Sequence, residues 1–424
     1  MVDIHVIREN PELIREALQK KHIDFDLDTF LEKDARMREL RVQIDDLRAR
    51  RNQGSRQIAT LRGDEKQQAI SDMQKVSSSL KELEPEYDAL EAEIAELLLY
   101  VPAPPAGDAP EGETEEDNVE IRRWGEPPAF DFEAKDHVAL GESLDIIDIA
   151  RGVKLAGSRS YILKNEGALL HWAVLRLAMD HLLEQGFTPI TVPVLVREPF
   201  MVGTTYFPQG KEQAYAVERD DLYLVGTAEV SLTSYYADEI LSVDDLPVRL
   251  VSNSPCFRRE AGTYGKDTRG VYRIHQFDKV EQVILCENDP DVSAEMHRLI
   301  LGNAEVVTQK LELPYRVVEV CTGDMGLGKY RMHDMECWMP GRNGYGETHS
   351  CSSFHDFQAR RLNLRYRDAE GKVRFAHTLN NTVIASPRIL IPLLEIHQQA
   401  DGSVRIPEAL RPYMGGREAI EPKA

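Results

Sequence analysis

Phe257-Arg258-Arg259-Glu260, followed after a glycine-rich basic loop by Arg273-Ile-His-Gln-Phe-Asp-Lys-Val-Glu281, is the stretch of sequence that decides the fold. Both halves alternate in the way strands do, and the pattern predicts two antiparallel strands with polar side chains on one shared face. Guanidinium groups bind phosphates, an aromatic ring stacks on a purine, and a deep carboxylate holds an ammonium or hydroxyl group. A solvated, salt-bridged sheet face is the alternative, and these residues alone leave both interpretations open.

The sequence around this strand pair predicts one large domain. A helix-like run covers residues 169–185, and β-rich runs cover 188–196, 249–260 and 271–285. Few β-α-β repeats are visible, which favours an antiparallel sheet flanked by helices over a doubly wound parallel sheet. We therefore expect an α+β domain over residues 136–424.

The first hundred residues follow a different, seven-residue beat. Apolar side chains recur at alternating steps of three and four over residues 37–61 and again over 73–97, with a short polar turn between the two runs. Two such seams predict an antiparallel coiled coil over about residues 30–100, inside an N-terminal arm of residues 1–105. The proline-rich end of that arm and the acidic residues after it predict a linker over 106–135.

Charge is unevenly distributed on this arm. The whole chain carries a formal net charge of -21, which at first argues against a nucleic-acid partner. Residues 36–62, however, carry +5, whereas residues 81–99 carry −6. The acidic base of the second helix can pair with part of the first, but not with the arginines nearer the tip, Arg51, Arg56 and Arg62. These suit an RNA backbone, but on composition alone a solvated or dimerising coiled coil ranks ahead of RNA binding.

Several other classes of protein are disfavoured by the sequence. Residues 323–329 are similar to a phosphate-binding P-loop, but Tyr330 stands where that loop needs Ser or Thr. Five cysteines occur without a C-x-x-C pair, which disfavours a zinc site or a disulfide framework. No apolar stretch is long enough to cross a membrane and no signal pattern begins the chain, so we expect a cytoplasmic protein without a membrane partner.

Five motifs in order resemble those of the class II aminoacyl-tRNA synthetases, in their seryl form. The resemblance covers nearly the whole chain, including the arm, and the ordered set is far more specific than any one motif. The segments are 186–193, similar to motif 1; 226–229, similar to the T-A-E loop that binds the amino acid; 257–281, similar to motif 2; 347–352, similar to the E-[IT]-x-S segment; and 379–388, similar to motif 3.

The resemblance implies a reaction and its partners. Such an enzyme activates L-serine with ATP, releases pyrophosphate, and passes the seryl group from seryl-adenylate to the 3′-terminal adenosine of tRNA(Ser). Activity on tRNA(Sec) stays open. We expect Mg²⁺ as cofactor and a homodimer formed through motif 1, at Pro193. A ligase that loads carrier proteins is a weaker alternative because its relatives lack the arm. A catalytically dead RNA-binding or scaffold paralogue is also weaker, because Arg258, Glu281 and Arg388 are present.

The resemblance also implies roles for individual residues. The catalytic residues are expected to be Arg258, Arg388 and Glu347, and Glu347 and Ser350 are expected to bind Mg²⁺. The residues expected to bind ATP are Arg258, Arg259, Glu260, Arg273, Ile274, Phe277, Glu347, Thr348, His349, Ser350 and Arg388. The residues expected to bind serine are Thr227, Ala228, Glu229, Arg258, Glu281, Asn380 and Thr382.

Overall fold

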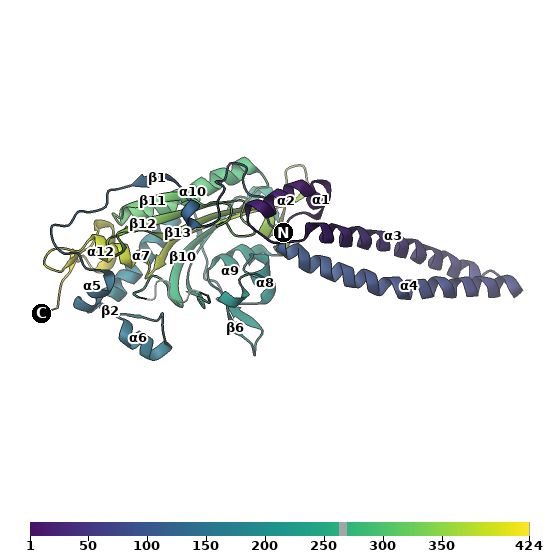
Figure 1. Cartoon of the computed structure of the whole chain (residues 1–424), viewed down its shortest axis with the longest axis horizontal. Helices are drawn as coiled ribbons and strands as arrows, with labels where there is room; N and C mark the ends of the chain where they lie inside the picture. The colour runs from purple at the N-terminus through teal and green to yellow at the C-terminus, as the bar shows by residue number, and fades with distance from the viewer. Residues whose placement is uncertain (263–268, 424) are drawn as a thin grey trace. The chain divides into compact units, whose positions relative to one another are not determined.

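The computed structural model describes residues 1–262 and 269–423, in two compact units (Figure 1). One unit is Val2–Pro102, and the other is Ala103–Ala424 together with Met1. Most of the predicted glycine-rich loop, residues 263–268, lies outside the described residues. No helix in the described ranges is long and apolar enough to span a membrane.

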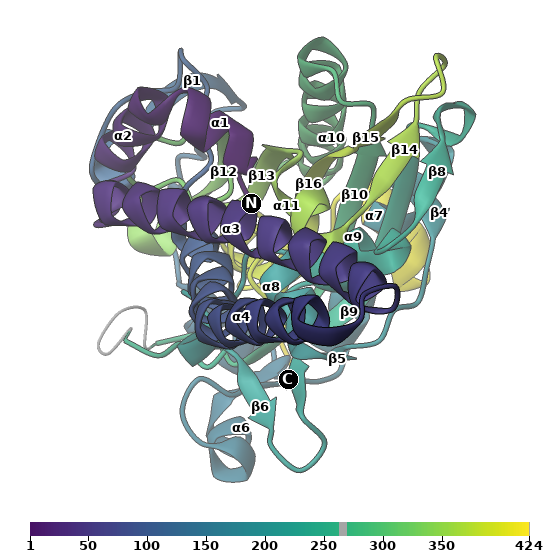
Figure 2. The same cartoon turned by 90° about the vertical axis from the view of Figure 1, so that its right-hand side faces the viewer.

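The N-terminal unit is built around two long antiparallel helices. They are α3 (Leu27–Ile58) and α4 (Gly63–Leu97), and they lie side by side in both views (Figures 1 and 2). Leu40 and Leu80 are fully buried between them, as the seven-residue beat predicted. The predicted coiled-coil arm is thereby confirmed. The shorter helices of this unit are α1 (Ile4–Glu9), α2 (Pro11–Lys20) and η1 (Leu98–Tyr100).

Ion pairs join the two helices of the arm toward its base. Arg36 donates to Glu86 at 2.9 Å, and Arg48 donates to Glu84 at 2.8 Å. Arg51, Arg56 and Arg62 lie beyond these pairs, are exposed, and form no ion pair with any described residue. The basic end of α3 therefore keeps positive charge that the arm does not neutralise internally.

The second unit is built on an eight-stranded sheet. Its strands are antiparallel, apart from the pairing of its last two, β9 and β4, which is parallel. In spatial order they are β1 (Val119–Trp124), β11 (Tyr315–Glu319), β12 (Arg331–Met339), β13 (Gly344–His355), β16 (His377–Ser386), β10 (Gln276–Cys286), β9 (Val248–Phe257) and β4 (Thr188–Pro189). The predicted α+β class with an antiparallel sheet is confirmed.

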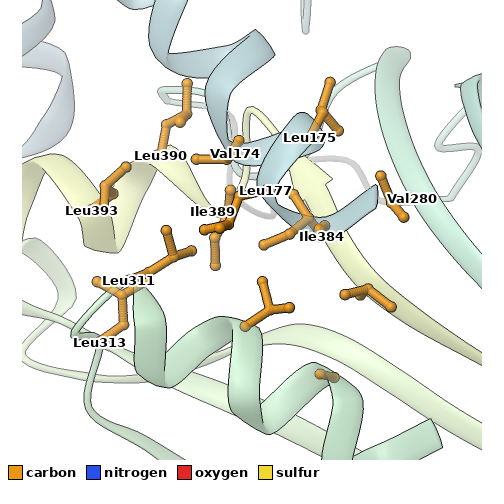
Figure 3. Packing of buried hydrophobic residues seen from close by; sticks show 14 of the residues in the cluster. Val174, Leu175, Leu177, Val280, Leu311, Leu313, Ile384, Ile389, Leu390 and Leu393 are labelled. Carbon is orange, nitrogen blue, oxygen red and sulfur yellow. The ribbon is translucent and has the colours of Figure 1, made fainter. Parts of the chain in front are cut away.

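Helices cover one face of this sheet. Those in the main core are α7 (Glu166–Glu184), α10 (Pro290–Lys310) and α12 (Leu390–Ile396), which pack with strand residues such as Ile384 (Figure 3). The Asn381 amide points to this side and donates to the carbonyl of Ile300 on α10 at 2.8 Å. Because side chains alternate along a strand, its neighbours Asn380 and Thr382 point to the other face. That face carries the site.

Smaller elements complete the second unit. The short helices are α5 (His137–Ser143), α6 (Ile149–Ala156), α8 (Glu198–Gly203), α9 (Glu229–Thr233) and α11 (Phe357–Leu362), with 3-10 turns η2 (Glu115–Asp117), η3 (Lys211–Gln213), η4 (Ser234–Tyr236), η5 (Val243–Asp245), η6 (Pro340–Arg342) and η7 (Glu408–Met414). The further strands are β2 (Ile147–Asp148), β3 (Ile162–Leu163), β5 (Leu195–Val196), β6 (Tyr215–Val217), β7 (Leu222–Leu224), β8 (Ile240–Ser242), β14 (Arg365–Arg367), β15 (Val373–Phe375), β17 (Val404–Arg405) and β18 (Ala419–Ile420).

The segment expected as an acidic linker, residues 106–135, belongs to the second unit. Its strand β1 pairs with β11, and the amide of Ala106 donates to the carbonyl of Tyr330 at 2.8 Å. Composition indicated a linker because the segment is acidic and rich in proline, but an edge strand needs only backbone groups to pair with a sheet.

The strands of the motif 2 segment are shorter than expected. Strand β9 ends at Phe257 and β10 begins at Gln276, so Arg258, Glu260 and Arg273 lie beyond the strands and not on a shared sheet face. Glu260 has a φ of 52°, outside the strand region. The three side chains nonetheless converge, because Arg273 donates to Glu260 at 2.8 Å across the opening of the loop.

Candidate active site

A pocket of about 570 Å³ lies on the face of the sheet opposite α7 and α10. Residues from β10, β12, β13, β16 and the end of β9 contribute to its walls, together with residues of the connecting loops such as Arg273 and Lys329. Most of the residues expected from the sequence line it, namely Glu229, Arg258, Glu260, Arg273, Ile274, Phe277, Glu347, Thr348, Ser350, Asn380, Thr382 and Arg388.

Two buried carboxylates, Glu229 and Glu281, form one end of the site. The amide nitrogen of Asn380 bridges them, donating to Glu229 Oε2 at 3.1 Å and to Glu281 Oε1 at 3.0 Å. The hydroxyl of Thr382 donates to Glu281 at 3.2 Å, and Lys279 forms an ion pair with it at 2.5 Å. Glu281 is fully buried beneath the pocket and does not line it. The network concentrates negative charge where a small cation could be held.

Glu229 differs from Glu281 in its surroundings. Burial, and then the charge of Glu281, raise the pKa of the Glu229 carboxyl above its ordinary value. Among the described residues no cationic side chain forms an ion pair with Glu229 as Lys279 does with Glu281. Its partners are the amides of Asn380 and Gln358 and the hydroxyl of Tyr206. An ammonium group entering the pocket would supply the missing counter-charge.

Arginine and aromatic side chains form the adjoining wall. The guanidinium carbon of Arg258 lies 5.3 Å from the ring centroid of Phe277, and its Nε donates to the carbonyl of Gly226 at 3.4 Å. Arg258 thus packs against Phe277 in the pocket that Glu229 and Arg388 also line. A fixed guanidinium there can bind an anionic group bidentately.

Arg388, from the segment after β16, lies at the other end of the pocket. Its Nη1 donates to the backbone carbonyl of Glu347 at 3.1 Å and lies 3.5 Å from the Glu347 carboxylate. Its Nε donates to the carbonyl of Tyr272 at 3.2 Å. These contacts fix the guanidinium plane without using all of its donors, so Arg388 can still bind a phosphate or stack on a base.

Glu347 and Ser350 present oxygen ligands in the same region. They lie on β13, and Ser350 is opposite Asp334 on β12 and hydrogen-bonded to its carboxylate. One Asp334 oxygen is buried and has no hydrogen-bond partner among the described atoms. No group of three or more His, Cys, Asp or Glu residues suited to hold a metal occurs in the described ranges. A carboxylate and a hydroxyl fit Mg²⁺, which favours oxygen ligands and completes its shell with water and substrate phosphates.

Besides Glu281, four expected residues lie behind the pocket or beside it. Thr227 and Ala228 are fully buried, and the hydroxyl of Thr227 accepts a hydrogen bond from the amide of Glu229. His349 points into the core, where its Nε2 lies 2.9 Å from the carbonyl of Val383, because it alternates with Thr348 and Ser350 along β13. Arg259 donates to the carbonyl of Glu212 at 3.1 Å, away from the pocket wall.

The sequence interpretation missed several pocket residues. Tyr206, Tyr272 and Lys329 line the pocket, and Gln358 contacts Glu229 from α11. Tyr206 and Gln358 lie in no segment with a phosphate-binding or metal-binding spacing, and Tyr272 lies within the motif 2 segment at a position to which the resemblance gave no role. Lys329 did occur in the rejected P-loop-like segment, and the structure places it in this pocket without a P-loop.

Comparisons with protein families agree on both units. Residues 215–397 match the family described as tRNA synthetase class II core domain (G, H, P, S and T). Residues 1–105 match the seryl-tRNA synthetase N-terminal domain. The two matches together include the arm and most of the sheet that carries the pocket.

Similar proteins cover the whole chain. A serine--tRNA ligase of Deinococcus radiodurans is 48% identical over 420 residues, which are 99% of each chain. One of Dictyoglomus turgidum is 45% identical over 427 residues, covering 100% of both. Among solved structures, seryl-tRNA synthetase from Pyrococcus horikoshii complexed with ATP gives a TM-score of 0.94 at 40% identity, covering 100% of both chains.

Proposed function

The chain belongs to the seryl-tRNA synthetase family of class II, and from that premise we propose how its residues carry out serine activation and transfer. It is a serine--tRNA ligase, which joins serine to tRNA with ATP. The observation that supports the residue assignment best is the buried Glu229–Asn380–Glu281 network beside Arg258.

We propose that Arg258 binds the α-phosphate and the serine carboxylate. In the first step the serine carboxylate displaces pyrophosphate at the α-phosphorus, and negative charge grows on the phosphate oxygens. A guanidinium held in place before the reaction stabilises that charge without reorganising. Arg388 and Arg273 are assigned to the outer phosphates, Phe277 and Arg388 to the faces of adenine, and Glu260 to its edge. Arg259, Ile274, Thr348 and His349 complete the proposed ATP site, with His349 acting from the core.

Serine binds, in this proposal, at the end of the pocket lined by Glu229, Asn380 and Thr382. Glu229 receives the ammonium group or hydroxyl, and the buried Glu281 acts from beneath by holding Thr382 and Asn380. Thr227 and Ala228 shape the turn that places Glu229. The side-chain oxygen of Asn380, Oδ1, is buried without a hydrogen-bond partner among the described residues and can accept a hydrogen bond from the substrate. Alanine lacks the hydroxyl and would leave such groups unpaired, which is the strongest kind of rejection a small pocket can achieve.

Glu347 and Ser350 would hold Mg²⁺, and Asp334 would orient the Ser350 hydroxyl. When bound, the ion neutralises charge on the phosphates of ATP. The protein presents these two oxygen ligands beside Arg388, which donates to the backbone carbonyl of Glu347 and so holds that residue in place.

The remaining assignments concern RNA and assembly. Residues 1–105 form the tRNA-binding arm, with Arg51, Arg56 and Arg62 contacting the tRNA(Ser) backbone, and residues 136–424 form the catalytic domain. The protein acts as a cytoplasmic homodimer through motif 1, where the carbonyl of Pro193 accepts a hydrogen bond from Ser231 at 2.7 Å. Light scattering of the purified protein tests the dimer, and serylation of tRNA(Ser) and tRNA(Sec) transcripts tests RNA choice.

Amino-acid-dependent ATP–pyrophosphate exchange tests the active-site assignment. Exchange should occur with serine among the twenty amino acids and should be abolished by Arg258→Ala and by Glu281→Ala. Exchange with a different amino acid would keep the fold and overturn the substrate. Exchange with none would favour a catalytically dead paralogue.

A further inference from the structure

A chain of hydrogen bonds runs from Thr378 through Gln358 to Glu229. The Thr378 hydroxyl donates to Gln358 Oε1 at 2.7 Å, and Gln358 Nε2 donates to Glu229 Oε1 at 2.9 Å. The three residues come from β16, α11 and α9, which are far apart in sequence. Thr378 and Gln358 lie outside the set assigned to substrate above.

The donors and acceptors in this series of hydrogen bonds follow from the chemistry of the groups. The backbone carbonyl of Thr204 and the carboxylate of Glu229 both face Gln358 Nε2 and can only accept. The Thr378 hydroxyl faces the other end of the amide and donates to its oxygen. A flipped amide would place its oxygen against the Glu229 carboxylate and its NH₂ against the threonine hydroxyl. The acceptors Glu229 and Thr204 therefore set the orientation in which Gln358 donates to Glu229, and the Thr378 hydroxyl satisfies the amide oxygen and holds the side chain in that place.

Burial makes that orientation matter. Gln358 is 1% exposed, Thr378 is fully buried and Glu229 is 6% exposed. Water has little access to replace a lost partner, so an unmade hydrogen bond here costs the desolvation of a polar group. Because Glu229 Oε1 is held by Gln358 and Oε2 by Asn380, the carboxylate plane has one preferred setting.

We propose that Gln358 and Thr378 are positioning residues for serine selection, acting through Glu229. This inference rests on the proposed role of Glu229 in binding serine. The pair fixes the carboxylate so that its free lone pairs, with the unpartnered carbonyl oxygen of Asn380, match the donors of serine. Groups that orient a ligand-binding side chain affect affinity although they never touch the ligand. ATP contacts none of these residues in the proposed site, so the effect is specific to the amino acid.

Steady-state exchange kinetics with matched variants test the inference. Thr378→Val removes the hydroxyl at constant volume, Thr378→Ser keeps it, and Gln358→Met removes the amide at similar length. We expect Gln358→Met to raise KM for serine by about tenfold, the effect of losing one hydrogen bond to a charged group, and Thr378→Val to raise it by about fivefold, the effect of losing one hydrogen bond between neutral groups. KM for ATP should stay within about twofold in both. Thr378→Ser keeps the hydroxyl, so its KM for serine should be close to that of the unaltered enzyme.

A buried threonine elsewhere in the same unit provides the matched control. Thr322 is 1% exposed and its hydroxyl oxygen has no hydrogen-bond partner among the described residues. Thr322→Val should leave both KM values unchanged. If Thr378→Val shifted the two KM values together, or left KM for serine unchanged, the positioning role would be overturned.

A double-mutant cycle separates positioning from a general packing role. Combined with Glu229→Gln, Thr378→Val should add little to the KM for serine, because the carboxylate it orients is gone. Full additivity would show that Thr378 acts by another route and would overturn the inference. Failure of the proposed function is distinguishable, because the unaltered enzyme would then show no serine-dependent exchange at all.

Discussion

The guanidinium of Arg388 lies over the ring of Tyr272, with its Cζ atom 4.4 Å from the ring centroid. The guanidinium of Arg342 also lies over this ring, at 4.5 Å. The Tyr272 hydroxyl donates to the carbonyl of Glu347 at 3.2 Å, the same carbonyl to which Arg388 donates. Tyr272 thus fixes Arg388, the arginine that is proposed to contact ATP. Its ring packs against the guanidinium, and its hydroxyl binds the same carbonyl of Glu347 as Arg388 does.

Replacing Tyr272 should weaken ATP binding. A desolvated cation–π contact contributes about 1–2 kcal/mol, so Tyr272→Leu should raise KM for ATP roughly tenfold with KM for serine nearly unchanged. Tyr272→Phe keeps the ring and should have a smaller effect. Exchange kinetics with varied ATP give both values. An unchanged KM for ATP in Tyr272→Leu would show that backbone contacts alone hold Arg388.

The arginines near the tip of the arm should matter for RNA and not for adenylate formation. Replacing Arg51, Arg56 and Arg62 together by alanine should raise KM for tRNA and leave ATP–pyrophosphate exchange unchanged. Each lost phosphate contact should reduce the dependence of log affinity on log salt by about 0.7–0.9. Filter binding at several salt concentrations measures this slope.

Arg48 is the matched control because it is paired with Glu84 within the arm. Arg48→Ala should leave the salt dependence of tRNA binding nearly unchanged. If the triple variant behaved like Arg48→Ala, the arm would have to contact RNA through another face.

Two helical glycines should respond to alanine in opposite directions. A Cβ on Gly152 in α6 would lie 2.6 Å from the backbone of Tyr161, whereas a Cβ on Gly302 in α10 would meet no atom within 4 Å. Alanine improves a helix interior by up to about 1 kcal/mol, and overpacking against backbone costs about 1–3 kcal/mol. Gly152→Ala should therefore lower the free energy of unfolding and Gly302→Ala should raise it. Denaturant titration of both variants gives the two signs, and a stabilised Gly152→Ala would contradict the close approach.

The sequence predicted those elements whose side chains follow a regular spacing or an ordered motif. The seam of α3 and α4, the antiparallel sheet and most pocket residues followed from local spacing or from ordered motifs. Arg258, Glu260 and Arg273 were expected on strands, yet they meet beyond the strand ends, where loop geometry replaces strand alternation. Gln358 could not be predicted, because only the tertiary packing of α11 brings it to Glu229. Tyr272 lies within the motif 2 segment, but its contact with Arg388 depends on how the loop after residue 268 packs.

Buried histidines should make the second unit sensitive to acid. Burial lowers the pKa of His297 to about 3 and that of His333 to about 4, and the two rings are joined by a hydrogen bond of 2.8 Å. In the unfolded chain both titrate at about 6.5. Below that pH the unfolded state binds protons that the folded state does not, so stability is complete above about pH 6.5 and falls as the pH is lowered toward 4.

The slope of that loss identifies the histidines. Each contributes on the order of 1.4 kcal/mol per pH unit within this window, which unfolding free energies measured between pH 7.5 and 5 can resolve. His297→Gln can still hydrogen-bond but cannot titrate, so its slope should be smaller by about one proton. Its free energy of unfolding at pH 7.5 should be lower than that of the unaltered protein, because a buried side chain is replaced. His5 is exposed, and His5→Gln should leave the slope unchanged. An equal slope in His297→Gln and the unaltered protein would mean that other groups, such as the buried His349, dominate the acid response.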